Sequence, residues 1–468
     1  MHLNTNTKAI LWSGVEKLGS FAANFILQII LARLLMPDDF AVLTMLAIFV
    51  YISQVFIDGG FATVLIQKQD CTDDDYNTVF TFNVLVALVA YGLFYMCAPY
   101  IERFYDFHGL IQVIRIYFLT LIINSFAMIN RLLLIKKLNF SVLAYINTIA
   151  VIIAAVPTVI LAYSGYNYWA LVCQNLVSTL VMAIGNIWAS RWTPKIRFSV
   201  TSMKSLLPFG VRVFAVDMFY SIYNNLYSLL IGKRYVPADL GYYDRAKTLG
   251  SIGPIGFSDF FMRALYPIQS KSNSDAELEV SYNRAFELCV LLIVPLSVFV
   301  GVFSEETIGL LYGPNWIPSS GFATLMCLGF MLYPLHSLNV NMLKVRARGD
   351  FLLRSEIIKK LIGITLALCL IRFDMQILLI GWLASVYLDF IISEIYVSKT
   401  YPFSLGKTIK SFFLTVALSS VLAIAIKIGI SQLELNGTFE FLISGIVYSV
   451  LYFVIFRHRF KDVLHTRS

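Results

Sequence analysis

Hydrophobic residues dominate this chain in fourteen long stretches separated by short polar connections. Each stretch is long enough to cross the roughly 30 Å hydrocarbon layer of a bilayer as an α-helix. Backbone amides inside a bilayer must bond within their own segment, which favours helices over open strands. We therefore predict an all-α polytopic membrane protein with about fourteen transmembrane helices. The predicted spans are 11–33, 40–66, 79–99, 110–134, 141–163, 167–189, 205–231, 243–267, 284–303, 318–342, 352–371, 375–397, 409–429 and 438–456.

The composition agrees with this fold class, at 58% hydrophobic residues and a mean hydropathy of +0.75. The connections are too short to hold a separate catalytic domain. The sequence carries no phosphate-binding lysine loop and no G-x-S-x-G nucleophile motif, so neither ATP hydrolysis nor nucleophilic catalysis is indicated. The six cysteines are scattered and form no metal-binding pattern. We expect no catalytic residues, no metal site and no cofactor.

The positive charge indicates the orientation in the membrane. Most of the 36 Lys and Arg residues fall on the side that carries both termini. The positive-inside rule therefore predicts that both termini are cytoplasmic. The net charge of +8 then reflects topology and contact with anionic membrane lipids, and no nucleic-acid partner is expected.

Two halves of the chain repeat one another at a separation of about 200 residues. Arg33 followed by Pro37–Asp39 matches Lys233 followed by Pro237–Asp239. Three further pairs follow in the same order: Asp58 with Asp259, Gln67 with Gln269, and Asn139-Phe140 with Asp350-Phe351. Because the halves are six helices apart, both begin on the same side of the membrane, which predicts a parallel repeat.

The repeat predicts a division into lobes. We expect an N-terminal lobe of six helices at residues 1–200 and a pseudo-symmetric C-terminal lobe of six helices at 201–400. Residues 401–468 would add two helices and a cytoplasmic tail. In such an arrangement the substrate path lies between the lobes.

Short motifs in a fixed order run through residues 8–400. They are Ala32–Phe40, Val64–Lys68, Phe209-Gly210, Asn224–Tyr227, Ile231–Lys233, Leu240–Ala246, Tyr266-Pro267, Asn315–Pro318 and Tyr333–Asn339. In this order they resemble the Wzx-type polysaccharide exporters of the multidrug/oligosaccharidyl-lipid/polysaccharide (MOP) superfamily. The resemblance is to the colanic acid and teichuronic acid exporter group.

This resemblance implies a flippase that moves oligosaccharide linked to undecaprenyl diphosphate across the bacterial inner membrane by alternating access. The product would serve capsule, O-antigen or exopolysaccharide synthesis, with glycosyltransferases and a polymerase of the same pathway as expected partners. Two other classes stay open. An ion-coupled multidrug efflux transporter of the same superfamily would need an acidic, aromatic cavity. A membrane-embedded glycan polymerase or acyltransferase would need a sizeable outer loop or an embedded catalytic His or Arg constellation, and the outer loops here are short.

Ionisable residues inside a bilayer are costly and are therefore functional candidates. Lys17 and Arg212 fall near the start of the first and seventh predicted helices, and we expect them to bind the lipid diphosphate. Lys247 and Arg263 are further candidates for this role. Alternatively, Lys17 and Arg212 extend to lipid headgroups and Lys247 is an interfacial anchor.

Four carboxylates are candidates for H⁺ or Na⁺ coupling: Glu16, Asp58, Asp217 and Asp259. Asp58 and Asp259 occupy matching positions in the repeat, and Asp217 lies deepest in its predicted span. The structural alternative is that Asp58 caps a break at Gly59-Gly60 and that Asp259 pairs with Arg263 four residues later.

Polar residues also follow the seventh predicted helix. Tyr220, Asn224, Asn225 and Tyr227 could contact sugar hydroxyls, or could hold neighbouring helices together by hydrogen bonds. For Arg115 and Asp389, which lie away from the expected cavity, we predict structural pairing.

Overall fold

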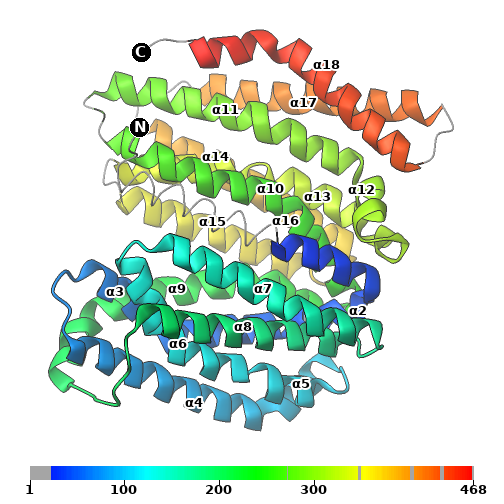
Figure 1. Ribbon diagram of the computed structural model, residues 1–468. Helices are drawn as coiled ribbons and strands as arrows, with labels where there is room; N and C mark the ends of the chain where they lie inside the picture. The colour runs from blue at the N-terminus through cyan, green and yellow to red at the C-terminus, as the bar shows by residue number, and fades with distance from the viewer. Residues whose placement is uncertain are drawn as a thin grey trace. The chain divides into compact units, whose positions relative to one another are not determined.

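The computed structural model describes residues 23–270, 272, 274–345, 349–400, 405–432 and 437–465. Over these ranges the chain forms α-helices, a short 3-10 helix at Pro314–Ser319 and connecting segments, with no strand (Figure 1). The prediction of an all-α chain is thus confirmed. The candidate residues Glu16 and Lys17 lie outside the described residues.

The chain divides by compactness into one unit that ends at Gly241 and a second that begins at Tyr242. The lobe boundaries expected at residues 200 and 400 stay predictions. The first unit begins, in its described part, with a helix at Ala23–Leu34. The helices that follow are α2 (Pro37–Asp58), α3 (Phe61–Gln67), α4 (Asp73–Tyr105), α5 (Leu110–Tyr117), α6 (Leu119–Lys136), α7 (Phe140–Tyr163), α8 (Tyr168–Ser190) and α9 (Val200–Arg234).

The second unit contains the other helices. Helix α10 (Pro237–Ser270) begins at the end of the first unit and continues into the second. The rest are α11 (Asp275–Val302), α12 (Ser304–Leu311), α13 (Ser320–Phe330), α14 (Tyr333–Val345), α15 (Gly349–Leu370), α16 (Met375–Ser398), α17 (Leu405–Ser431) and α18 (Gly437–His465).

Eleven helical segments of the described residues are long and apolar enough to cross a membrane, and Ala23–Leu34 is a shorter apolar helix. The polytopic membrane fold is therefore confirmed, and the count of fourteen stays a prediction. The predicted spans 243–267 and 352–371 form helices α10 and α15 but are not among the eleven. Both helices carry several ionisable residues, which lower their mean hydropathy.

Three predicted spans are each divided into two helices. The stretch 40–66 forms α2 and α3, 110–134 forms α5 and α6, and 318–342 forms α13 and α14. The first break has a clear cause. Gly59 and Gly60 take positive φ angles of +57° and +75°, a left-handed conformation that glycine adopts without steric cost.

The repeated Pro-x-Asp motif builds the start of a helix. Pro37 is the first residue of α2, and the carboxylate of Asp39 accepts a hydrogen bond of 2.9 Å from the backbone N–H of Met36. Pro237 likewise begins α10, and the Asp239 carboxyl bonds to the backbone of Val236. Both features suit a helix N-terminus. The motif therefore specifies helix entry in both halves.

In the first unit, Lys136 at the end of α6 fixes the end of α3. Its Nζ donates to the carbonyl oxygens of Leu65 at 3.0 Å and Lys68 at 2.7 Å. A lysine suits this place because the last carbonyls of a helix carry partial negative charge. Phe61 and Leu65 lie on one face of α3 and pack against buried residues of α4 and α6.

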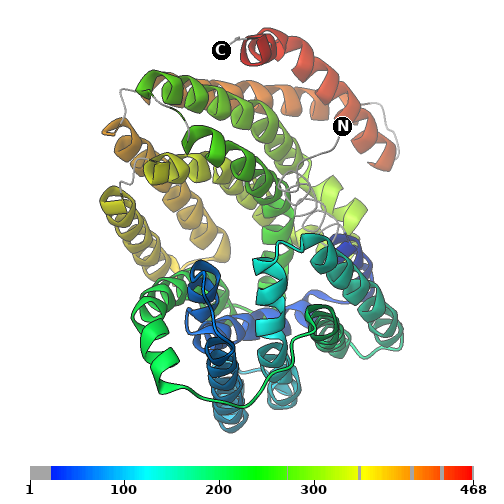
Figure 2. The ribbon, with the colours of Figure 1, turned by 60° about the vertical axis from the view of Figure 1, so that its left-hand side comes forward.

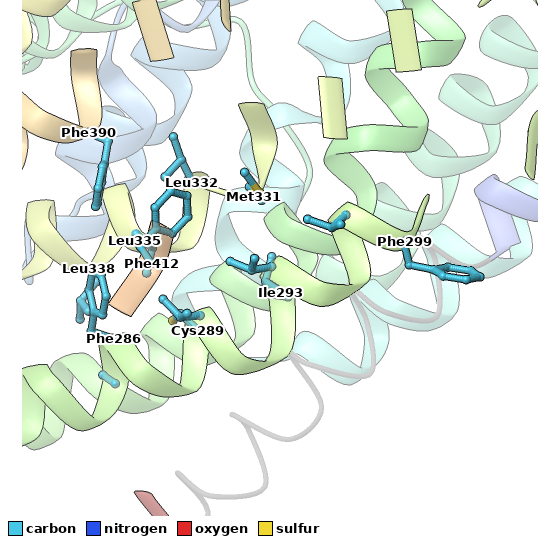
Figure 3. Close-up of a cluster of buried hydrophobic side chains, with 14 of the residues drawn as sticks. Phe286, Cys289, Ile293, Phe299, Met331, Leu332, Leu335, Leu338, Phe390 and Phe412 are labelled. Carbon is cyan, nitrogen blue, oxygen red and sulfur yellow. The ribbon is translucent and has the colours of Figure 1, made fainter. Parts of the chain in front are cut away.

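The core of the second unit forms around α11. Figure 3 shows Phe286, Cys289 and Ile293 of α11 in a buried cluster that also contains Leu335 of α14 and Phe412 of α17. Helix α17 lies beside α11, and α18 packs against both, as Figures 1 and 2 show.

Buried tyrosines fasten α18 to α11. The hydroxyl groups of Tyr448 and Tyr452 each donate to an α11 carbonyl oxygen at 3.1 Å, those of Pro295 and Leu291. Arg459 of α18 also forms an ion pair with the α11 carboxylate Glu287. The two last helices, expected as an addition to the repeat, therefore pack directly on the core of the second unit.

Candidate functional site

Helix α9 contains most of the candidate residues of the first unit. It is 35 residues long and packs against α2, α3 and α4. At Gly210 its backbone passes directly beside the α2–α3 break, because a Cβ placed on Gly60 would lie 2.3 Å from the Gly210 carbonyl oxygen. Glycine at this crossing allows a close approach that a larger residue would prevent.

A polar stripe on α9 is formed by Asp217, Tyr220 and Asn224. Their spacing of three and four residues places them on one face of the helix. All three are exposed, and Tyr220 keeps 55% of its surface accessible. They lie within a helix long and apolar enough to cross a membrane. The stripe is therefore the strongest candidate in the first unit for contact with a polar ligand.

The two other predicted glycan contacts take part in packing. The side-chain amide of Asn225 donates to the carbonyl oxygen of Ser221 at 2.9 Å, and Asn225 is half-buried. Tyr227 is 5% exposed. Adjacent positions on a helix point about 100° apart, so Asn224 and Asn225 have different environments despite identical side chains.

Asp58 and Asp217 lie close enough for their carboxyl groups to interact electrostatically. Asp58 is the last residue of α2, and its Oδ1 accepts a hydrogen bond of 3.0 Å from the backbone N–H of Ala62. This hydrogen bond spans the Gly59-Gly60 break, as the structural alternative for Asp58 expects, and the coupling role of Asp58 stays a prediction. The same geometry brings two of the predicted coupling carboxylates together.

Arg212 lies on a different face of α9. It precedes Asp217 by five residues, which at about 100° per residue separates the two side chains by roughly 140° around the helix. Its side chain is exposed. Its expected partner in diphosphate binding, Lys17, is not among the described residues, so that pair stays a prediction.

The candidates Lys247, Asp259 and Arg263 lie along α10 in the second unit. Lys247 is half-buried, and its Nζ lies 5.7 Å from the centre of the Tyr243 ring, within range of a cation–π interaction. Asp259 is half-buried and Arg263 is exposed. Their proposed roles stay predictions.

One group of ionisable side chains in the second unit was not predicted. Glu356 of α15 forms ion pairs with Lys359 and, at 3.8 Å, with Lys360, and its Oε1 lies 3.7 Å from Nε2 of His336 on α14. Asp389 of α16 interacts electrostatically with the same lysines. A run of charged residues inside the predicted span 352–371 was the available signal.

A second polar network joins α11, α14 and α16. The Tyr282 hydroxyl contacts the carboxylate of Glu394 at 2.9 Å and the amide oxygen of Asn339 at 2.7 Å, and all three side chains are buried. The Asn339 amide nitrogen also donates to Glu394 at 3.0 Å. Such a network fixes the packing of three helices.

Arg115 is not held by an ion pair within the described part of the chain. Its guanidinium lies 4.2 Å from the centre of the Tyr95 ring, and its buried Nε has no hydrogen-bond acceptor. The structural role expected for Arg115 is therefore provided by an aromatic ring of α4.

The fold and the polar stripe define a polytopic helical membrane protein with a polar face inside the membrane-spanning region. Comparison with known families then places the chain more narrowly. The family described as "Polysaccharide biosynthesis protein" matches residues 30–321. The chain belongs to this family.

Several curated relatives are similar over much of the chain. The succinoglycan biosynthesis transport protein ExoT of Rhizobium meliloti (strain 1021) is 24% identical over 68% of this chain and 64% of the relative. The teichuronic acid biosynthesis protein TuaB of Bacillus subtilis (strain 168) is 22% identical over 64% of this chain and 62% of its own. The lipopolysaccharide biosynthesis protein WzxC of Escherichia coli (strain K12) is 21% identical over 74% of this chain and 71% of the relative. The matched part of the chain thus spans less than two thirds of the first two relatives.

Solved structures share the fold. The lipid II flippase MurJ in an inward closed conformation has a TM-score of 0.77 at 16% identity, covering 97% of this chain and 99% of that chain. An inward-facing multidrug resistance MATE family transporter of the MOP superfamily has a TM-score of 0.59 at 15% identity, over 83% and 96%. The superfamily fold expected from the sequence motifs is confirmed.

Proposed function

We propose that this protein is a secondary transporter that flips lipid-linked oligosaccharide across the bacterial inner membrane for surface polysaccharide synthesis. The observation that carries the proposal is the exposed stripe Asp217, Tyr220 and Asn224 on a membrane-spanning helix. Membership of the polysaccharide biosynthesis family and the transport function named for ExoT support it. On this proposal the chain moves its substrate and catalyses no covalent reaction.

The chemistry of the stripe suits a glycan. Asn224 offers an amide that both donates and accepts hydrogen bonds, and Tyr220 adds a hydroxyl and an aromatic face. These groups match sugar hydroxyls and the apolar faces of sugar rings. Arg212, with a guanidinium suited to bidentate phosphate binding, would contact the diphosphate.

Coupling in the first unit would involve Asp58 and Asp217, because their carboxyl groups interact electrostatically in a membrane-spanning region. Binding H⁺ or Na⁺ between two such carboxyls would reduce their repulsion. A conformational change that separates them would release the cation. Asp217→Asn should therefore flatten the dependence of flipping on a pH or Na⁺ gradient.

We further propose that both termini are cytoplasmic, from the distribution of Lys and Arg. Glycosyltransferases that assemble the oligosaccharide, and a polymerase that consumes it, are the expected partners. Cysteine labelling from each side of the membrane, at single cysteines placed in the C-terminal tail and in the 371–374 connection, would test the orientation.

The direct test uses purified protein in liposomes with fluorescent lipid-linked oligosaccharide. Flipping is measured as the fraction of glycan that becomes protected from an external glycosidase. The variant Tyr220→Ala with Asn224→Ala should slow flipping strongly, because both polar contacts are lost. Ile222→Ala is the matched control, since Ile222 is 43% exposed on the opposite face of α9. Equal rates for the double variant and the control would contradict the proposal.

Multidrug efflux is the second candidate, because MATE family transporters share the fold. Expression in a drug-sensitive strain separates the two functions. A flippase should leave drug susceptibility unchanged and restore surface polysaccharide in a strain that lacks its own exporter. The opposite pair of results would favour efflux.

A further inference from the structure

The second unit contains a group of charged side chains that the proposed substrate contacts do not use. We call it the α14–α16 charge cluster: His336, Glu356, Lys359, Lys360 and Asp389. It joins three helices, with His336 on α14, three residues on α15, and Asp389 on α16. Charged groups inside a membrane-spanning bundle are costly, so each of them needs a neighbouring group that compensates its charge.

Glu356 is the well-compensated carboxylate of the cluster. Its Oε1 bonds to Lys359 and lies 3.7 Å from Nε2 of His336, while its Oε2 lies 3.8 Å from Lys360. Lys359 is only 1% exposed and also donates to the Ser393 hydroxyl at 3.2 Å. Both lysines of the cluster are therefore directed to Glu356.

Asp389 lacks comparable compensation. The lysines influence it electrostatically, yet no ion pair joins either of them to its carboxylate in the described ranges of the chain. Its Oδ1 is buried and accepts no hydrogen bond. An ionised carboxylate with a buried oxygen that receives no donor is unfavourable in an apolar surrounding.

Within the described residues, no ion pair joins Asp389 to a cation of the other helices packed on α16. Helix α13 carries no Asp, Glu, Lys, Arg or His. His336 of α14 is shared between Glu356 and the Ser393 hydroxyl, at 3.3 Å from the latter. Lys344 of α14 and Lys410 of α17 are exposed. Lys427 of α17 forms an ion pair of 2.7 Å with Glu306. The Oδ1 atom of Asp389 therefore has no hydrogen-bond donor and could bind one small cation.

A proton fits this position better than a metal ion. Metal ions such as Na⁺ or Ca²⁺ need several oxygen ligands, whereas a proton needs one carboxyl oxygen. No group of three His, Cys, Asp or Glu residues that could hold a metal occurs within the described residues.

We propose that Asp389 is a proton-binding site of the second unit, which takes up H⁺ from water on one side of the membrane and releases it to the other during the transport cycle. The coupling part rests on the proposed transport function, while the proton-binding part does not. Uptake adds one H⁺ to the carboxylate and leaves a neutral carboxyl group, so the cluster gains one positive charge. Helices α15 and α16 would respond, because Lys359 and Lys360 interact electrostatically with the carboxyl groups of both Glu356 and Asp389.

Proton binding can be measured without transport. In protein reconstituted into lipid nanodiscs, infrared difference spectra between low and high pH record the C=O stretch of protonated carboxyl groups. We expect the titrating band of the wild-type protein to contain one component that Asp389→Asn removes, while the components of the other carboxyl groups remain. Asp374→Asn is the matched control, since Asp374 is an exposed carboxylate at the start of the same helix. A titrating band that is identical in the wild-type protein and in Asp389→Asn would overturn the site.

Coupling is measured separately in liposomes under imposed gradients. We expect a pH gradient to accelerate flipping in the wild-type protein, Asp389→Asn to lose this acceleration at least tenfold, and Asp389→Glu to restore it. Because asparagine resembles a protonated carboxyl, the variant should fold and flip without a gradient. Acceleration by a Na⁺ gradient alone, or an unchanged pH response in Asp389→Asn, would overturn the coupling role. If the wild-type protein does not flip the substrate at all, the proposed function is contradicted. Proton binding at Asp389 is then tested by the infrared experiment alone.

Discussion

The contact between Gly60 and α9 gives a prediction about stability. A Cβ at residue 60 would lie 2.3 Å from the Gly210 carbonyl oxygen, 2.9 Å from the backbone nitrogen of Phe214 and 3.0 Å from Cβ of Val213. The first two contacts are with backbone atoms, which cannot rotate away. The substitution Gly60→Ala must therefore separate α9 from the α2–α3 break.

The size of the effect has two parts. A non-glycine residue at φ +75° costs about 1–2 kcal/mol. Forcing an extra methyl group into a packed contact costs about 1–3 kcal/mol. We expect Gly60→Ala to lower the free energy of unfolding by about 2–5 kcal/mol, as the sum of these terms.

Two other glycines serve as matched comparisons. Gly59→Ala also places alanine at a positive φ, +57°, but the three atoms nearest to its Cβ are ring atoms of Phe61 and Phe82, which can move. Gly92 lies inside α4 with no atom within 4 Å of its Cβ. Alanine there should be neutral or stabilising by up to about 1 kcal/mol, because glycine is a poor helix former.

The assay is the midpoint of thermal unfolding of the purified protein in detergent, followed by circular dichroism. The expected order of midpoints is Gly92→Ala equal to or above wild type, then Gly59→Ala, then Gly60→Ala. If Gly60→Ala unfolds at or above the midpoint of Gly59→Ala, the close backbone approach is not a constraint. The reasoning about how α9 is positioned would then be wrong.

Three other predictions follow from the contacts. Lys136→Met leaves two carbonyl groups at the end of α3 without their donor, which should lower the free energy of unfolding by about 1–3 kcal/mol. Lys137→Met replaces the exposed neighbour and should leave the free energy of unfolding almost unchanged. Tyr282→Phe removes a donor from a buried carboxylate and should lower stability by a similar amount, about 1–3 kcal/mol; unchanged midpoints would contradict this. Lys17→Ala with Arg212→Ala should abolish flipping while the protein inserts at normal levels, and unchanged surface polysaccharide would refute the diphosphate role.

The fold could be predicted from the sequence because its main signal is local. A stretch of apolar residues specifies a membrane-spanning helix without reference to any partner, and the predicted spans correspond to helices throughout the described residues. The Pro-x-Asp motif is equally local, because Asp39 bonds to a backbone group three residues away. The breaks were harder to place: Gly59-Gly60 and Pro334 mark two of them, whereas the break between α5 and α6 contains neither glycine nor proline.

The candidate sites were predicted less completely, because the orientation of a side chain depends on its helix neighbours. Asn224 and Asn225 could not be distinguished until the packed face of α9 was known. The α14–α16 charge cluster escaped prediction for a related reason. His336 and Glu356 are twenty positions apart and Lys359 meets Ser393 from another helix, so no sequence spacing shows their contact.

The position of a charge in a predicted span does not show its environment. Lys359 falls in the first half of the span 352–371, where a lysine would be expected to extend to the interface. It is instead 1% exposed and bonded to Glu356 and Ser393. A buried lysine stays charged only when acceptors surround it, so the compensation of Lys359 by Glu356 is what leaves Asp389 short of a partner. Glu356→Gln should therefore free a lysine for Asp389 and lower the pH at which the infrared carboxyl band appears; a band unmoved by this variant would mean that the two carboxyls do not share the same lysines.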